Sequence, residues 1–210
     1  MIRVLAFIRR LPGVSRDAFR SHYEEIHVPI ALPFLAGTAG YLRHHVREEI
    51  LGTPGFDCMT RFDYPDAASV RAVFERTEGP QADAIRRDER TFMDKPAIVF
   101  FPVEEVPGWG QPGADAERLL VCARRPRTEQ AAGFRARLWD RELPALRAAA
   151  GPRWCRAWSP PATPERGFDA VLEIAAVGSG EIRRWAQALE AEGASLIAVR
   201  VSVHETRMPG

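Results

Sequence analysis

Residues 19–29 read FRSHYEEIHVP, and their pattern organises the rest of the chain. The aromatic and branched side chains recur at the spacing of one face of an α-helix, which predicts an amphipathic helix over about residues 16–28. The residues of this face are Phe19, Tyr23, Ile26 and Ile30. His27 lies on a flank of the face, and Pro29 is expected to end the regular turn just after it. We therefore expect His27 to stand where the helix passes from the core to a cleft.

Apolar segments and turn signals around this helix predict a complete small sheet in the first hundred residues. Two further helices are expected, one that begins near residue 65 and one over about residues 81–92. Strands are expected at residues 3–9, 40–48, 56–62 and 97–103. The resulting order, β-α-β-β-α-β, is the ferredoxin-like arrangement within the α+β class.

The same pattern starts again after a segment rich in proline and glycine, residues 107–113. The spacing from Phe134 to Glu142 and Pro144 equals the spacing from Phe19 to His27 and Pro29. We interpret this as an internal repeat. It predicts a first ferredoxin-like repeat at residues 1–106, a linker at 107–116 and a diverged second repeat at 117–210. Two antiparallel sheets of this kind would pack face to face and form a pseudo-dimeric α/β barrel within one chain.

The composition is that of a globular protein, with 46% hydrophobic and 27% charged residues. A net charge of +1 without a basic block argues against nucleic acid as a partner. No apolar run is long enough to span a membrane, and the N-terminus does not resemble a secretory signal, so we expect a cytoplasmic protein without a membrane partner. Three scattered cysteines are expected to fill the core. The chain would be a monomer, as an intramolecular pseudo-dimer, or a homodimer.

The first half resembles the EthD-type members of the dimeric α/β-barrel superfamily. The resemblance covers nearly all of residues 1–106, and its specific part is the helix that ends in His27-Val28-Pro29. The other matching stretches are residues 9–15, 56–57, 88–94 and 103–105. Relatives in this superfamily include aromatic polyketide cyclases and decarboxylases, cofactor-free quinone-forming monooxygenases, and heme enzymes of the chlorite dismutase and dye-peroxidase type. EthD-type proteins are often linked to degradation or to secondary metabolism.

His27 is the leading candidate for an acid/base group, because imidazole exchanges protons near neutral pH. Tyr23 lies one turn earlier and could orient a phenol or carbonyl oxygen. Alternatively, His27 could be a structural histidine that is hydrogen-bonded to the backbone. The residues expected to bind substrate are Arg61, Asp57, His44 and Phe19. For Arg61 a salt bridge, and for Asp57 a turn cap, are the structural alternatives.

The second repeat carries Glu142 where the first has His27, and Leu138 where the first has Tyr23. This difference predicts one working pocket, in the first repeat. Metal-ligand spacings and nucleotide-binding motifs are absent from the sequence. The heme-containing relatives use a histidine from the helical region of the second repeat, whereas the only histidine of this second repeat is His204, in its last strand. We therefore expect no metal and no cofactor.

These observations predict an enzyme that works without a bound cofactor on a hydrophobic, polyketide-like or aromatic carbonyl compound. Its reaction would be a proton transfer in secondary metabolism: cyclisation, dehydration or decarboxylation. A first alternative is a cofactor-free monooxygenase of phenolic or quinone-type substrates. A second alternative is an accessory protein that binds a small molecule without converting it.

Overall fold

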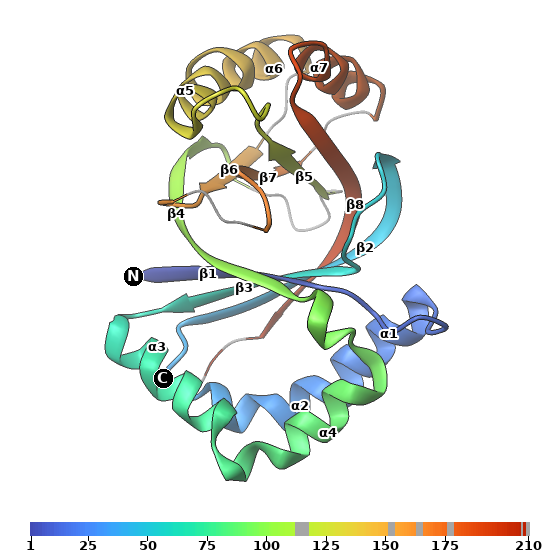
Figure 1. The fold of residues 1–210 in the computed structure, drawn as a ribbon, viewed down its shortest axis with the longest axis vertical. Helices are drawn as coiled ribbons and strands as arrows, with labels where there is room; N and C mark the ends of the chain where they lie inside the picture. Colours follow the sequence, from blue (N-terminus) through green and yellow to red (C-terminus); the bar gives the residue numbers. More distant parts are fainter. Residues whose placement is uncertain (112–117, 151–153, 163–165, 176–178, 207, 209–210) are drawn as a thin grey trace. The chain divides into compact units, whose positions relative to one another are not determined.

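The computed structural model describes residues 1–111, 118–150, 154–162, 166–175, 179–206 and 208. Its eight strands are hydrogen-bonded in the closed order β1-β3-β2-β8-β5-β7-β6-β4. The strands are β1 (Ile2–Ile8), β2 (Gly40–Leu51), β3 (Cys58–Tyr64), β4 (Val99–Trp109), β5 (Arg118–Arg124), β6 (Trp154–Ser159), β7 (Ala170–Ala175) and β8 (Ser195–Thr206). The order β4-β1-β3-β2 within the first repeat equals β8-β5-β7-β6 within the second. The predicted α+β fold, an antiparallel barrel built from two ferredoxin-like repeats, is confirmed (Figure 1).

The chain forms two compact units, whose limits differ from those of the two repeats. Unit 1 comprises Met1–His45, Gly55–Pro102 and Val203–Gly210, and unit 2 comprises Val46–Pro54 and Val103–Ser202. The strands β2, β4 and β8 therefore each contribute residues to both units. In particular, the last residues of β8 belong to unit 1 although they come from the second repeat. Part of the expected linker is strand, because β4 continues to Trp109, and residues 112–116 lie outside the described residues.

The first helical segment does not end at Pro29, as the sequence suggested, but continues to Leu35. It consists of α1 (Arg16–His22), a π-helical turn η1 (Tyr23–His27), α2 (Val28–Ala31) and a 3₁₀ turn η2 (Leu32–Leu35). A proline lacks an N–H group, and its ring clashes with the carbonyl four residues earlier. The preceding turn is widened, with the Val28 N–H bonded to the Tyr23 carbonyl five residues back, so the helix accommodates the proline.

The second repeat contains the same device. Helix α5 (Ala131–Arg137) passes through a π-helical turn, η5 (Leu138–Glu142), into α6 (Leu143–Ala150). The Leu143 N–H bonds to the Leu138 carbonyl, and Pro144 follows. The two π-helical turns occupy corresponding positions, in agreement with the internal repeat that the spacing of the sequence indicated.

A second feature shared by the repeats is a carboxylate that fixes the end of the first strand. Asp57 accepts hydrogen bonds from the backbone N–H and the Nε of Arg10, at 3.1 and 3.0 Å. In the second repeat, Asp169 accepts the corresponding bonds from Arg125, at 3.0 and 3.2 Å. Both aspartates are buried. Their role in the fold explains why an acidic residue immediately precedes the third strand of each repeat.

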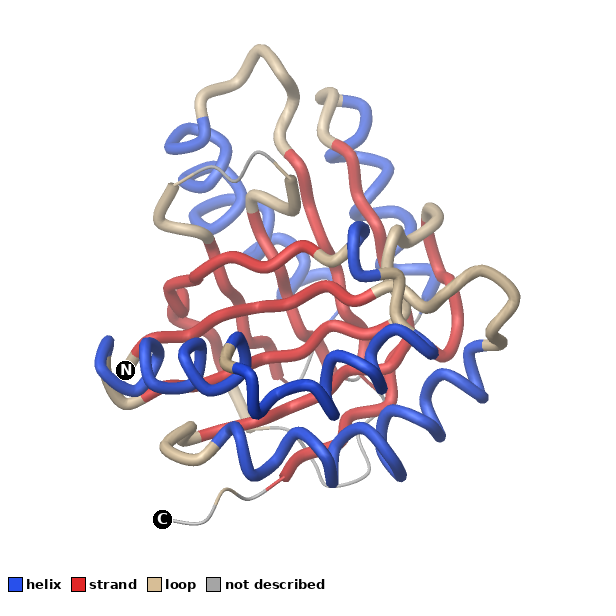
Figure 2. Tube along the Cα trace, turned by 60° about the horizontal axis from the view of Figure 1, so that its bottom comes forward, coloured by secondary structure: helices blue, strands red, loops and turns tan. Residues whose placement is uncertain are grey.

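The repeats differ most in the helices that follow their third strands. In unit 1 this region holds α3 (Ala67–Glu78), a 3₁₀ turn η3 (Pro80–Ala82), α4 (Asp83–Phe92) and a 3₁₀ turn η4 (Lys95–Ala97) (Figure 2). In unit 2 a single helix, α7 (Ser179–Ala191), takes their place. The indole of Trp185 on α7 joins the apolar core and donates a hydrogen bond to the carbonyl of Glu142 at 3.1 Å. Glu142 corresponds to His27, so a tryptophan packs beside this position in the second repeat.

The cysteines Cys58, Cys122 and Cys155 are all buried and free, which agrees with a core-filling role. Among the described residues, no helix is both long and apolar enough to cross a membrane.

Candidate functional site

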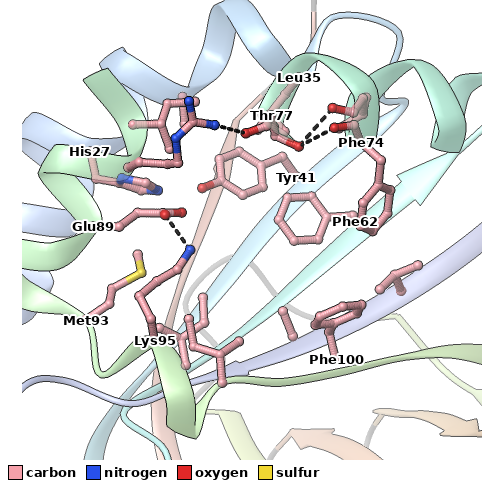
Figure 3. Close-up of a pocket in the computed structure, with 18 of the residues that line it drawn as sticks. His27, Leu35, Tyr41, Phe62, Phe74, Thr77, Glu89, Met93, Lys95 and Phe100 are labelled. Atoms are coloured by element: carbon pink, nitrogen blue, oxygen red, sulfur yellow. Dashed lines mark hydrogen bonds and ion pairs between the residues drawn. The ribbon is translucent and has the colours of Figure 1, made fainter. Parts of the chain in front are cut away.

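A pocket of about 550 Å³ lies within unit 1, between its strands and its helices (Figure 3). The strand wall is apolar and aromatic, with Val4, Ala6 and Ile8 from β1 and Phe62 from β3. The helical wall adds apolar groups from α2, η2, α3 and α4. The chain has three tyrosines, and all of them line this pocket: Tyr23, Tyr41 and Tyr64. Such a cavity suits a ligand with a large apolar or aromatic body and few polar groups.

The predicted acid/base residue, His27, lines this pocket and is buried. Its Nδ1 lies 2.8 Å from Oδ2 of Asp88, a residue of α4. A carboxylate accepts hydrogen bonds, so Nδ1 carries the proton and Nε2 of the neutral ring offers a lone pair. Burial lowers the pKa of His27, and the hydrogen bond that its ring donates to Asp88 opposes this effect only in part. His27 is therefore a neutral imidazole near pH 7, the form that can accept a proton.

The same carboxylate also holds His22, the last residue of α1. Oδ1 of Asp88 lies 2.7 Å from Nε2 of His22, whose ring packs on the ring of Phe92 with 4.4 Å between the centroids. Asp88 thus joins two turns of the first helical segment to α4. A signal for this role was present in the sequence, because Asp88 shares a helical face with the buried Ile85 and Phe92, three residues after the first and four before the second.

Tyr23, the second predicted catalytic residue, also lines the pocket and contacts His27, with 5.0 Å between the ring centroids. Its hydroxyl lies 3.2 Å from the Thr60 hydroxyl and also forms a hydrogen bond with the Tyr41 hydroxyl. Burial raises the pKa of both Tyr23 and Tyr41. Both phenols therefore stay protonated and can donate hydrogen bonds. The sequence did not single out Tyr41, whose ring and hydroxyl face the same space as His27 in Figure 3.

A buried charged network supports this pair of tyrosines. The guanidinium of Arg43 lies over the Tyr41 ring, 4.4 Å from its centroid, and Arg43 Nη2 is 2.6 Å from Oε2 of Glu24. Oε1 of Glu24 lies 2.7 Å from Nε2 of His45. Burial raises the pKa of Glu24, but hydrogen bonds from Arg43 and His45 outweigh it and bring it to about 2. Burial lowers the pKa of His45, but interactions with Cys58 and Glu24 raise it to about 9.

The end of β8 completes the network. Arg43 Nη1 donates to the Thr206 hydroxyl at 2.9 Å, and Nδ1 of His204 lies 3.7 Å from Oε2 of Glu24. These two residues come from the second repeat in sequence but belong to unit 1. The second repeat therefore contributes directly to the surroundings of the pocket.

The four residues expected to bind substrate do not line the pocket. Phe19 packs on the ring of Tyr23, with 5.7 Å between the centroids, and so supports the pocket from within the core. Asp57 holds Arg10 and also Arg16, at 3.1 Å. His44 has its Nδ1 3.3 Å from the Met59 carbonyl, and Arg61 pairs with Asp63 at 2.9 Å.

The alternation of strand side chains explains the placement of His44 and Arg61. Tyr41 of β2 and Phe62 of β3 line the pocket. Because side chains alternate along a strand, Arg61, next to Phe62, points to the opposite face of the sheet. His44, three residues after Tyr41 and paired with Met59, points to that opposite face too. His45, and not His44, therefore lies on the face of β2 that meets the first helical segment, as its bond to Glu24 shows. The sequence could not decide between the two adjacent histidines.

No group of three or more His, Cys, Asp or Glu side chains among the described residues is arranged to hold a metal ion. The resemblance also extends to heme enzymes, but the residues of this chain do not fit the heme site of those enzymes. That site takes a histidine from the helical region of the second repeat, and residues 131–150 contain none. His204 instead lies beside Glu24 and packs edge-on against His45.

Comparison with solved structures identifies the same fold in proteins of very low sequence identity. An anthrone oxidase-like protein superposes with a TM-score of 0.61 at 10% identity, covering 97% of this chain and 92% of the other. A protein from Lactobacillus acidophilus, named a "putative monooxygenase", gives 0.50 at 12% identity over 99% and 96% of the two chains. A chlorite dismutase from Candidatus Nitrospira defluvii gives 0.51 at 10% identity over 96% and 90%. These likenesses establish the fold.

A search of the curated proteins found no match. The family comparison found one, to the EthD domain at residues 11–96. The matched region contains the first helical segment, β2, β3, α3 and α4, and hence His27, Asp88 and most of the pocket. Residues 11–96 of this chain are therefore similar to the EthD domain, and the chain as a whole shares the antiparallel α/β-barrel fold of these solved structures.

Proposed function

We propose that unit 1 oxidises a phenolic aromatic compound with molecular oxygen, without a bound cofactor and with His27 as the base. The observation that carries the proposal is the neutral His27, held by Asp88 at the wall of an apolar pocket that also contains three tyrosines. A base of this kind can remove the proton that keeps an electron-rich aromatic compound unreactive. The resulting anion is the species that gives electrons to oxygen.

The reaction balances for a substrate with two tautomers, one with a ring CH₂ group and a ketone, and the other with a phenol. Nε2 of His27 accepts the phenolic proton, and the anion reacts with O₂ at the ring carbon. One oxygen atom becomes the new carbonyl oxygen and the other leaves as water, so that CH₂ and O₂ give C=O and H₂O. The proton on His27 returns with the departing oxygen, and the substrate itself supplies all electrons.

The tyrosine pair would hold the substrate oxygen while its charge develops. Tyr41 and Tyr23 are protonated donors in a water-poor site, where a hydrogen bond to a developing anion is worth more than in bulk water. The apolar walls formed by residues such as Ile8, Phe62 and Met93 would position the aromatic rings.

The same base could drive a cyclisation, dehydration or decarboxylation, which the sequence suggested first. The proteins of this fold that are named monooxygenase or anthrone oxidase-like make oxidation the better supported of the two proposals. Oxygen consumption separates them, because the alternatives need none.

The proposal is tested with anthrone and 1-naphthol in an oxygen electrode, with ¹⁸O₂ to follow the new carbonyl oxygen. We expect the wild-type protein to consume oxygen in proportion to product, and the His27→Ala variant to be slower by about 100-fold or more. Glu25→Ala, in the same turn but exposed, serves as the control. Product formed without oxygen consumption would favour the cyclase alternative. Saturable binding without any product would favour the accessory binding protein.

A further inference from the structure

The charged groups of the pocket gather on one wall. They lie on α4 and on the segments just before and after it, whereas the strand wall is apolar and aromatic. The charged lining residues are Glu78, Arg86, Glu89, Arg90 and Lys95. A ligand in this pocket would therefore meet charges on one side only.

Three of these residues already have partners. Arg86 binds the carboxylate of Asp83 at 2.6 Å and reaches the carbonyls at the end of α3. Glu89 forms an ion pair with Lys95, shown by a dashed line in Figure 3. The charges of these residues are thus largely compensated within the protein.

Arg90 is different. It is exposed, it lines the pocket, and it makes no hydrogen bond or ion pair with any residue that the structure describes. Arg90 lies two residues after Asp88, so its backbone belongs to the same part of α4 as the carboxylate that binds His27. Glu78 is the last residue of α3; its carbonyl accepts a hydrogen bond from Arg86, and its side chain makes no such contact among the described residues.

We propose that the substrate of this pocket carries a carboxylate, which Arg90 binds while the phenolic end meets His27. This inference rests on the proposed function only for the phenolic end. A guanidinium binds a carboxylate through two parallel hydrogen bonds, which fix the orientation of a flat ligand as well as its affinity. The substrate class is therefore a hydroxylated aromatic acid rather than a neutral phenol.

The test measures binding without oxygen, so it does not depend on turnover. The probes are 6-hydroxy-2-naphthoate and 2-naphthol, which share one ring system and differ by the carboxylate, and calorimetry under nitrogen gives both dissociation constants. We expect the wild-type protein to bind the naphthoate roughly tenfold more tightly than the naphthol. This preference should weaken as sodium chloride is raised.

Arg90→Gln should abolish the preference and leave the affinity for 2-naphthol unchanged, and Arg90→Lys should restore part of it. The matched control is Arg87→Gln, which removes an exposed cation of the same helix that does not line the pocket and should keep the wild-type ratio. Equal affinities in the wild type, an unchanged ratio in Arg90→Gln, or no binding of either probe would overturn the inference. Binding with the expected ratio but no oxygen uptake would leave it standing and refute only the oxidation.

Discussion

Asp88 of α4 connects this helix to the first helical segment and holds the ring of His27 at the pocket. One of its carboxylate oxygens bonds to His27 and the other to His22. It fixes the tautomer of the His27 ring, and it opposes the effect of burial on the pKa of this ring. Asp88 touches no part of the pocket space itself, and so it is a positioning residue in the proposed reaction.

The pH profile of Asp88→Asn tests this role. In the wild type the active base is neutral His27, whose pKa lies below 6.5, so activity should be lost only as the pH falls below that value. Without the carboxylate the pKa of His27 falls further. We expect turnover to drop by about 100-fold and the acidic limb of the profile to move to lower pH.

The control for this variant is Asp83→Asn, an exposed aspartate of the same helix. It should leave both the rate and the acidic limb at their wild-type values. A lower rate with an unmoved limb in Asp88→Asn would show that Asp88 only maintains the fold.

At the scale of the elements, the π-helical turn η1 serves two sides of the first helical segment. It directs Tyr23 and His27 to the pocket, and it directs Glu24 to Arg43 and His45 on β2. Arg43 is only 3% exposed, so Glu24 is the group that compensates a charge held away from water. Removing one partner of such a pair lowers the stability of the fold by more than the intact pair adds to it, because the other charge is left buried without compensation.

Glu24→Gln should therefore lower the free energy of unfolding by about 3 kcal/mol. Its neighbour Glu25 is exposed, and Glu25→Gln should change the stability little. The pKa of Glu24 is lowered from 4.5 to about 2, so its contribution is complete above pH 4.5 and is lost as the pH falls through 2. Urea unfolding of the three proteins at pH 6 and pH 3 measures both effects, and equal stability of the two variants at pH 6 would contradict the prediction.

The elements and their order could be predicted from the sequence, since hydrophobic period, caps and turns are local signals. The position of His27 and Tyr23 in a pocket followed from the same helix. The partners of these residues could not be predicted, because Asp88 is 61 residues from His27 and is brought to it only by the packing of α4. For the same reason the sequence could not tell which face of the sheet Arg61 and His44 occupy, because the register that decides their direction is set by the neighbouring strands.

At the scale of the whole molecule, the two repeats have kept the frame and diverged in the space it encloses. The π-helical turns and the Arg–Asp bonds recur in both. In the first repeat α3 and α4 leave a pocket, whereas in the second α7 brings Trp185 against the position that corresponds to His27. Unit 2 has a pocket of similar volume, about 540 Å³, but neither Glu142 nor Trp185 lines it, so a single working site in the first repeat stays a prediction.

Because β2, β4 and β8 contribute residues to both units, we expect the units to unfold together. The aromatic residues allow this to be measured, since all five tryptophans belong to unit 2 and all three tyrosines to unit 1. Tryptophan fluorescence and tyrosine absorbance should give the same urea midpoint. Two midpoints separated by more than the error of the fits would show that the units unfold independently.

The ion pair at the pocket has a practical consequence. Lys95 is the only lysine of a chain that contains 29 basic residues, and it lines the pocket beside Glu89. Lys95 is therefore the only side chain of this sequence that an amine-directed reagent would modify. A dye or a crosslinker attached to Lys95 would report on whatever enters the pocket, without the need to engineer a cysteine or remove competing sites.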